Sequence, residues 1–266
     1  MTANKPLIDI CFNFTHRAFR EDEREVLRRA VDGGVVAMVV PGSGVADSAE
    51  ALALAKRYPE LLYAGAGVHP HHAREWDDDA GDELRRLAAD DKVVAIGETG
   101  LDYCRDFSPR DLQRAVFERQ ILLAAETRLP LFMHQRDAHD DFLAVLAPLR
   151  ERVGNAVVHC FTGDRAMLAD YLDLGLFIGV TGWICDERRG HALRDAVAHI
   201  PDDRLMIETD APYLAPRTLR PAPRGRRNEP AFLAHIAREI AACRNTSFAS
   251  LCRTVTANTR RFYGID

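Results

Sequence analysis

The chain of 266 residues alternates short apolar runs with longer segments of helical periodicity, and this alternation constrains its fold more than any other feature. The apolar runs, each a predicted strand, cover residues 7–12, 35–40, 61–68, 93–97, 131–134, 156–159, 177–180 and 205–208. The predicted helices cover residues 21–32, 47–58, 79–89, 109–127, 138–149, 165–173 and 190–199, followed by 230–242 and 247–262. Eight strand-and-helix units in succession predict an α/β fold with a parallel sheet closed into a (β/α)8 barrel.

An open, doubly wound sheet is the structural alternative. That fold binds nucleotides through a glycine-rich turn after an early strand. Here Gly42-Ser43-Gly44 follows Val40 but lacks the rest of the required spacing. The chain has no low-complexity linker, and residues 221–227 are interpreted as a strand-to-helix loop. We therefore expect one domain over residues 1–266.

Composition limits the partners and the compartment. A net charge of −5 argues against a protein held on nucleic acid by an overall positive field, although a local basic patch is compatible with it. Residues 1–6 are polar and no apolar run is long enough to span a bilayer, so we expect a cytoplasmic protein. Six cysteines without C-x-x-C spacing predict free thiols, not a disulfide framework.

Four potential metal ligands stand where predicted strands end. They are Glu98, His134, His159 and Asp210. The active site of a parallel barrel is assembled from the loops that follow its strands, so ligands far apart in sequence are expected to meet at one mouth. Two histidines and a carboxylate leave coordination positions open for water and substrate. The positions of these residues therefore predict a metal site.

Each ligand also has a structural interpretation when taken alone. Glu98 and Asp210 could cap the elements that follow them, and a lone histidine at a strand end is more often a hydrogen-bonded core residue. Two histidines that end consecutive strands, His134 and His159, are a much stronger signal than either alone. Asp210 is also the candidate base for a water molecule at the site, and Glu208 on the same strand could instead hold a basic side chain.

Seven stretches lie in order along nearly the whole chain and carry a family resemblance. They are GVHPH at 67–71, AIGETGLD at 95–102, MHQRDA at 133–138, HCFTG at 159–163, GVTGW at 179–183, ETDAPYL at 208–214 and RRNEP at 226–230. Together they resemble the TatD family of metal-dependent hydrolases. The resemblance implies a TIM (β/α)8 barrel of the amidohydrolase type, with divalent metal bound by the residues that match Glu98, His134, His159 and Asp210. It also implies hydrolysis of phosphodiester bonds in DNA, typically from the 3′ end of single strands.

The first strand departs from the family pattern. Most members resemble one another in an Asp-x-His-x-His motif there, whereas this chain has Asp9-Ile10-Cys11-Phe12-Asn13. A thiol and an amide replace imidazole poorly on a hard cation. We therefore expect one firm metal site and a doubtful second one that depends on Asp210. The resemblance favours Mg²⁺ as the working ion, with Mn²⁺ or Zn²⁺ as alternatives.

Further residues near the predicted mouth are candidates for catalysis and substrate binding. The catalytic set is Asp210, Glu98 and His69, and the substrate-binding set is His69, His71, Arg136, Tyr213, Arg226 and Arg227. The loop at 217–227 carries five arginines, which suits contacts to a single strand but also fits a solvated loop. Arg136 could equally support the metal ligands. Tyr213 and Trp183 could stack on bases, although buried rim aromatics are the commoner outcome.

The favoured function is a metal-dependent 3′-to-5′ exonuclease that degrades single-stranded DNA, with RNA as a second substrate. It is expected to release 5′-mononucleotides and to serve DNA repair or degradation as a monomer with no membrane partner. One alternative is a metal-dependent amide, ester or lactone hydrolase, because one barrel hosts many chemistries. Another is a non-catalytic metal-binding protein, which the missing first-strand histidines suggest.

Overall fold

The computed structural model describes residues 5–266, and eight parallel strands in sequence order form its single sheet. The strands are β1 (Leu7–Asp9), β2 (Val35–Val40), β3 (Leu62–Ala66), β4 (Val93–Asp102), β5 (Leu131–Arg136), β6 (Ala156–Val158), β7 (Phe177–Val180) and β8 (Leu205–Ile207). Each strand pairs with the next one along the chain, from β1 through β8.

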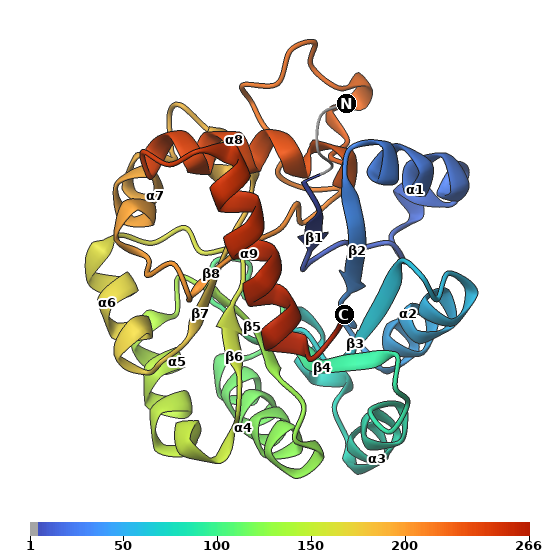
Figure 1. Ribbon diagram of the computed structural model, residues 1–266. Coiled ribbons are helices and arrows are strands. Elements are labelled where there is room, and N and C mark those ends of the chain that lie inside the picture. Colours follow the sequence, from blue (N-terminus) through green and yellow to red (C-terminus); the bar gives the residue numbers. More distant parts are fainter. Residues whose placement is uncertain (1–4) are drawn as a thin grey trace.

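Helices connect the strands and surround the sheet (Figure 1). They are α1 (Glu23–Asp32), α2 (Val45–Arg57), α3 (Asp78–Leu87), α4 (Arg110–Thr127), α5 (His139–Leu146), α6 (Arg165–Asp173), α7 (His191–Ala196), α8 (Leu233–Cys243) and α9 (Phe248–Tyr263). This arrangement confirms the predicted barrel. It also places every loop that follows a strand at the same end.

The eighth strand returns to the first and nearly closes the barrel. Phe12 and Ala211 form an isolated parallel bridge, and the backbone N–H of Asp210 donates to the carbonyl of Cys11 at 3.0 Å. The buried Asp9 carboxylate strengthens the seam, because it accepts from the backbone N–H of Thr209 at 2.9 Å. As a result, Asp210 lies beside the first strand, although about 200 residues separate them.

Strand β4 is longer than the predicted run, which ended at Gly97. It continues to Asp102 and pairs with β5 as far as Arg136, with a register shift between Ile96 and Thr99. Two glycines make this path possible: Gly97 and Gly100 have φ values of 142° and 130°, and a Cβ at either would collide with a carbonyl oxygen of β5. Glu98 therefore lies within a strand and not after one.

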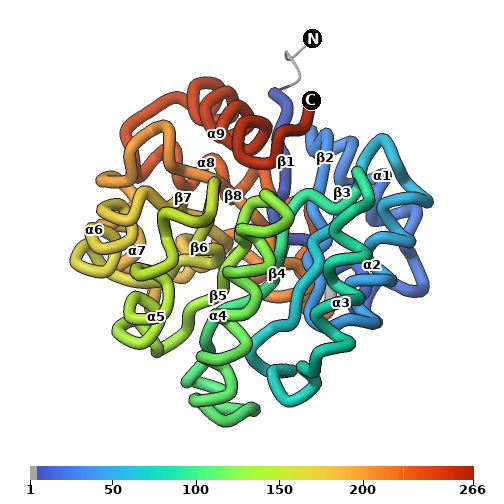
Figure 2. The backbone as a smooth tube through the Cα atoms, turned by 90° about the horizontal axis from the view of Figure 1, so that it is seen from below, coloured from blue at the N-terminus to red at the C-terminus, as the bar shows by residue number. Residues whose placement is uncertain are grey.

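The core has two layers. Side chains from the inner faces of the strands, such as Val39, Phe132 and Met206, form a packed centre with Phe262 from α9. A larger apolar cluster lies between the strands and the surrounding helices. Asn155, directly before β6, donates to the Phe262 carbonyl at 2.9 Å. The end of α9 therefore lies across the end of the barrel at which the strands begin (Figure 2). Side chains fill the inside of the barrel. The open end, or mouth, is the end opposite α9, where the loops that follow the strands lie.

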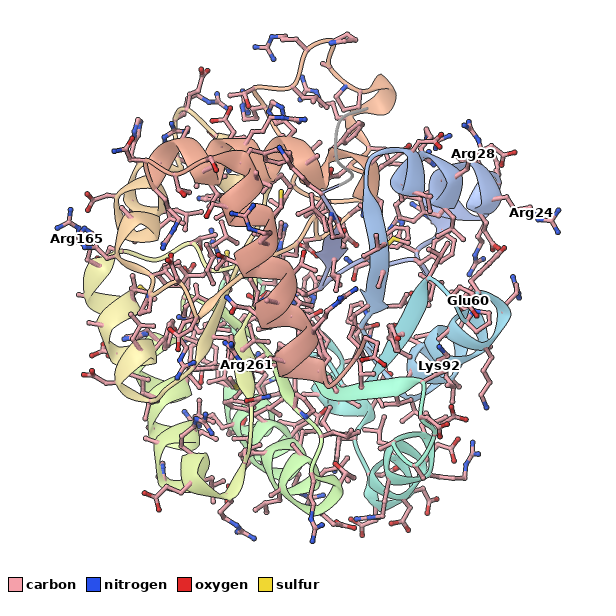
Figure 3. The ribbon with its side chains drawn as sticks, viewed as in Figure 1. Arg24, Arg28, Glu60, Lys92, Arg165 and Arg261 are labelled. Atoms are coloured by element: carbon pink, nitrogen blue, oxygen red, sulfur yellow. The ribbon has the colours of Figure 1, made fainter. Side chains whose placement is uncertain are left out.

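Charged side chains cover the outside. Figure 3 shows Arg24 and Arg28 on α1 and Arg165 on α6 projecting away from the molecule. Among residues 5–266, no helix combines the length and the apolar character needed to cross a bilayer.

Candidate metal centre

Three histidine nitrogens surround one carboxylate oxygen at the mouth of the barrel. Oε1 of Glu98, on β4, lies 2.9 Å from Nε2 of His159, 3.0 Å from Nδ1 of His134 and 3.2 Å from Nε2 of His69. Nδ1 of His134 and Nε2 of His159 are 3.4 Å apart. The side chains of Glu98, His134 and His159, predicted from strand ends, do converge on one point, and His69 joins them.

The donor set fits a divalent cation. Ring nitrogens and a carboxylate oxygen are the ligands that Zn²⁺, Mn²⁺ and related ions take in proteins. A second observation supports the fit: His69, Glu98 and His134 each offer one ligand atom, and these three atoms all lie within 4.8 Å of one another.

Burial and charge set the protonation of these ligands. Burial alone raises the pKa of Glu98, but the neighbouring charge of His159 and hydrogen bonds from His134 and His159 outweigh it, so this pKa is well below its usual range. Burial alone lowers the pKa of His159, but the carboxylates of Glu98 and Glu208 outweigh it and raise this pKa well above its ordinary value. In the metal-free protein, a protonated His159 therefore faces an ionised Glu98. A cation that binds there must displace the proton.

His69 differs from the other two histidines. It follows β3, and its Nδ1 accepts a 3.1 Å hydrogen bond from the backbone N–H of His71. Burial lowers the pKa of His69 to about 4, so the ring is neutral at pH 7 and its proton is on Nε2, facing Glu98. This tautomer makes His69 a hydrogen-bond donor in the mouth.

Glu208 holds a basic side chain, the imidazole of His159. The carboxylate of Glu208 is fully buried, with Oε2 lying 3.3 Å from Nδ1 of His159 and Oε1 accepting from the backbone N–H of Cys160 at 2.5 Å. It thus contacts the ring nitrogen that faces away from Glu98. A carboxylate behind a metal-binding imidazole fixes the orientation of the ring and raises its basicity.

Asp102 belongs to the site, although its position does not mark it as a strand-end ligand. Its Oδ2 lies 2.7 Å from Nε2 of His71 and 3.4 Å from Nε2 of His134. Hydrogen bonds from both histidines overcome the effect of burial and lower the pKa of Asp102. The available signal was its spacing: Asp102 is four residues after Glu98 in the same strand, and an even spacing puts both carboxylates on one face.

Asp210 lies at the seam with the first strand. Its Oδ1 accepts from Nδ2 of Asn13 at 2.9 Å and from the thiol of Cys11 at 3.6 Å. Burial raises the pKa of Asp210 to about 6 and raises the pKa of Cys11 well above its ordinary value. The thiol is therefore neutral, so the first strand offers Asp210 two hydrogen-bond donors where imidazole nitrogens would supply metal ligands.

The mouth opens into a cavity of about 400 Å³. Its walls carry the clustered residues together with Asn13, His71, Asp210 and Tyr213. Tyr213 is 52% exposed and meets His16 edge-on, with ring centroids 5.7 Å apart, so it forms part of the rim. Three of the predicted substrate-binding residues, His69, His71 and Tyr213, therefore line the same cavity as the candidate ligands.

The arginines of the predicted substrate-binding set are spread more widely. Arg136 does not line the mouth cavity, and its guanidinium donates to Oγ1 of Thr162 at 2.8 Å. Arg226 is exposed, and neither it nor Arg227 lines the mouth cavity. Of the loop arginines between 217 and 227, the side chain of Arg224 lies outside the described residues.

Arg227, which is predicted to bind substrate, is held by two acidic side chains. Its guanidinium lies 2.7 Å from carboxylate oxygens of both Asp22 and Glu229, and Arg29 binds the same two acids. The hydrogen bond to Asp22 is the main cause that raises the pKa of Arg227 above its ordinary value. This side chain fastens the loop before α8 to the segment before α1.

Comparisons with known proteins agree with this geometry. The model of the family described as TatD related DNase matches residues 8–264. The chain is 46% identical over 259 residues to a 3′-5′ ssDNA/RNA exonuclease TatD from Erwinia tasmaniensis, covering 97% of this chain and 100% of that protein. It is 48% identical over 257 residues to the protein of the same name from Dickeya dadantii, covering 97% of each.

Solved structures share the whole architecture. A TatD homologue from Escherichia coli has a TM-score of 0.89 at 31% identity, covering 98% of both chains. A hydrolase of the TatD family from Entamoeba histolytica has a TM-score of 0.87 at 29% identity, covering 97% of both. An uncharacterized amidohydrolase from Saccharomyces cerevisiae shares the fold at 24% identity, with a TM-score of 0.84. This chain belongs to the TatD related DNase family.

Proposed function

We propose that this protein is a metal-dependent 3′-to-5′ exonuclease that hydrolyses phosphodiester bonds of single-stranded DNA and RNA and releases 5′-mononucleotides. The observation that carries the proposal is the convergence of His134, His159 and Glu98 beside a cavity at the barrel mouth. Relatives at 46–48% identity bear the name of such an exonuclease, which supports the substrate class. These names do not favour an amide, ester or lactone hydrolase or a non-catalytic protein.

Glu98, His134 and His159 would hold the metal in the firmer site, and Asp210 would hold a second ion with Glu98. A bound divalent cation supplies charge neutralisation at the phosphoryl group and activation of a water molecule. We propose Mg²⁺ as the working ion, with Mn²⁺ and Zn²⁺ as alternatives. The firmer site also suits the last two, because imidazole is a favoured ligand for zinc and other transition metals.

The other residues of the mouth handle protons and position the substrate. Asp210, with its pKa of about 6, is mostly ionised at pH 7 and yet basic enough to accept a proton from the attacking water. Neutral His69 would donate from Nε2 to a phosphate oxygen. His71, held by Asp102 at 2.7 Å, would make a second contact to the phosphate, and Tyr213 on the rim would face the nucleotide.

We also propose a single domain over residues 1–266 that acts as a monomer in the cytoplasm, in DNA repair or degradation. Residues 1–4 of that domain lie outside the described part of the chain. The single eight-stranded sheet of residues 5–266, with apolar clusters on both of its sides, supports one domain. The exposed Arg226 is retained as a contact to the backbone of a single strand.

The direct test is digestion of end-labelled single-stranded oligonucleotides with Mg²⁺, Mn²⁺ or EDTA. A 5′ label should give a ladder of shortened products and a 3′ label should be released at once as a mononucleotide, whereas EDTA should stop both. Glu126→Gln, an exposed change on α4, serves as a control with unchanged activity. Intact DNA and RNA with every metal tried, or cleavage that EDTA leaves untouched, would disprove the proposal.

A further inference from the structure

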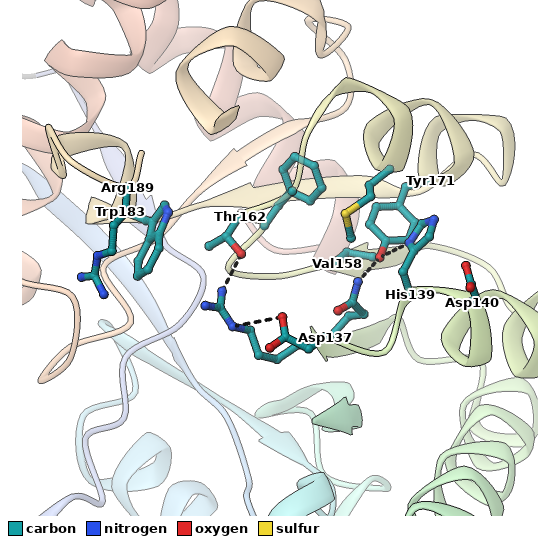
Figure 4. Close-up of a pocket in the computed structure, with 13 residues that line it drawn as sticks. Asp137, His139, Asp140, Val158, Thr162, Tyr171, Trp183 and Arg189 are labelled. Carbon is teal, nitrogen blue, oxygen red and sulfur yellow. Dashed lines mark hydrogen bonds and ion pairs between the residues drawn. The ribbon is translucent and has the colours of Figure 1, made fainter. Parts of the chain in front are cut away.

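A second cavity of about 450 Å³ lies beside the metal centre, within the size range of about 300–1,000 Å³ that is usual for small-molecule sites. Figure 4 shows this cavity, with Thr162, Trp183, Arg189, Tyr171 and His139 around it. It is separate from the mouth cavity. Its walls come from the ends of β5 and β6 and from the 3-10 helix Gly182–Cys185 that follows β7.

The two cavities adjoin through residues next to the metal ligands. Arg136 lines the second cavity and follows His134 by two residues in β5. Val158 lines it as well and directly precedes His159. A chain with its scissile phosphate at the metal centre therefore has a neighbouring nucleotide within reach of this cavity.

The chemistry of the cavity is that of a stacking platform next to positive charge. Trp183 is only half-buried, and the guanidinium groups of Arg189 and Arg136 lie over its ring, 4.4 Å and 5.3 Å from the ring centre, where a stacking base would replace one of them. Aromatic side chains that carry the faces of bases, together with basic groups for the backbone, are how proteins bind single strands without sequence preference. Arginine next to such a ring adds a cation–π contribution.

A purely structural role explains this arrangement less well. Arg189 is neutralised by Asp186 at 2.8 Å, but the close partner of Arg136 is the uncharged Thr162. The nearest acid to Arg136, Asp137, is 3.9 Å away and exposed. Arg136 therefore keeps most of its positive charge available to an anion in the cavity.

Hydrogen bonds hold the side chains of the opposite wall in place. Nε2 of Gln135 donates to the hydroxyl of Tyr171 at 2.6 Å, and Nδ1 of His139 lies 3.0 Å from the same hydroxyl. Nε2 of His139 is in turn 2.8 Å from Asp170. Fixed walls reduce the entropy that a bound group must lose, so this cavity is prepared for a ligand.

We propose that this second cavity is a nucleotide subsite, in which the base next to the scissile phosphate stacks on Trp183 and Arg136 contacts a backbone phosphate. The subsite rests on the proposed function for its substrate class. Every base has an aromatic face, so the subsite binds bases with little sequence preference. This property suits an enzyme that removes nucleotides one after another.

Binding can be measured without cleavage by tryptophan fluorescence. The chain has two tryptophans, so replacing one leaves the other as the single reporter. Trp76→Phe leaves Trp183 as the one tryptophan, and Trp183→Phe leaves Trp76. A phosphorothioate-linked deoxyadenosine trinucleotide, which resists hydrolysis, should quench the fluorescence of the first variant saturably and leave the second unchanged. Equal quenching in both variants, or none in the first, would overturn the subsite.

Kinetics give the second test. Trp183→Ala should lower kcat/KM for single-stranded DNA by about 5- to 150-fold, the effect expected for one lost stacking contact. Trp183→Phe keeps an aromatic face and should lower it less, whereas Trp76→Phe, outside both cavities, should stay close to the parent. An abasic residue at one of the two 3′-terminal positions should abolish the difference between parent and Trp183→Ala. Arg136→Gln should lower the slope of log K for DNA binding against log salt concentration by about 1, the change expected for one lost phosphate contact. A Trp183→Ala variant with parental kcat/KM overturns the proposal.

The two tests separate this inference from the proposed function. Quenching by the trinucleotide in a protein that cleaves no nucleic acid would support the subsite while the exonuclease assignment fails. Cleavage of nucleic acid, with no quenching and with parental kcat/KM in Trp183→Ala, would support the exonuclease assignment while the subsite fails.

Discussion

Asn13 Nδ2 donates a 2.9 Å hydrogen bond to Oδ1 of Asp210, across the seam between the first and last strands. The amide thus occupies, with the thiol of Cys11, the place from which most family members are expected to present imidazole. An amide donor satisfies a carboxylate without metal. This contact is a physical reason for a weak second metal site and leads to the first prediction.

Asn13→Asp should make the protein more dependent on metal. Two carboxylates would then face each other in a buried seam, which raises their pKa values and destabilises the apo protein, whereas a divalent cation between them relieves the repulsion. Thermal unfolding should show a lower Tm in EDTA and a larger rise on addition of Mn²⁺ than in the parent. Asn13→Ala, which only removes the donor, is the control. Equal metal-induced shifts in all three proteins would contradict this view of the seam.

Glu98→Gln should abolish tight metal binding and lower nuclease activity by at least ~100-fold, because loss of a group that merely supports a ligand already costs roughly 10- to 100-fold. In the parent, metal binding should release a proton, since the pKa of His159 is raised well above its ordinary value. Affinity should therefore increase with pH. Calorimetry in buffers of different ionisation enthalpy measures the number of protons released and the metal affinity. Binding with no proton release would argue against His159 as a ligand.

Glu208→Gln should weaken metal binding by about 10- to 100-fold while the protein stays folded. The change keeps the size of the side chain and an oxygen for the Cys160 N–H, but removes the charge that lies 3.3 Å from His159 Nδ1. The calorimetric Kd for Mn²⁺ is the readout, because a merely structural role would leave it unchanged. Glu187→Gln, in an exposed loop, is the matched control.

Asp9→Asn should remove a pH dependence of stability. Burial raises the pKa of Asp9 from 3.8 to about 7, so between about pH 4 and 7 the folded protein holds a proton that the unfolded chain has released. The free energy of unfolding therefore falls as pH rises through this window, by up to about 4 kcal/mol for a shift of this size. Urea denaturation measures the free energy of unfolding at pH 5 and pH 8. Relative to the parent, the variant should be more stable at pH 8 than it is at pH 5. A constant difference would refute the shift.

Arg227→Ala should destabilise the fold, whereas Arg226→Ala should not. Arg227 shares Asp22 and Glu229 with Arg29, but the network is partly exposed, so we expect a loss of about 1 kcal/mol and a fall in Tm of about 2–4 °C. Arg226 is exposed, and its loss should instead weaken binding of single-stranded DNA and reduce the salt dependence. The opposite pattern would mean that the roles of the two arginines are reversed.

The order of elements was predictable from sequence because periodicity is a local property. All eight strands and the helices between them lie within or close to their predicted ranges, and Glu98, His134 and His159 meet because a parallel barrel brings the ends of its strands together. The length of β4 was not predictable. Its extension to Asp102 depends on backbone conformations at Gly97 and Gly100 that fit against β5.

The sequence by itself determined the barrel, the family and the positions of the candidate ligands at the strand ends. Only the tertiary structure decided which partner each polar side chain takes: Glu208 contacts His159, Asp102 contacts His71, and Arg227 binds Asp22. Those pairs are separated by 49, 31 and 205 residues, and side chains reach them only after register and packing are fixed. Hydrophobic periodicity specifies which face of an element is buried, but the partner of a buried charge depends on distances of a few ångströms between elements, and these exist only in the folded chain.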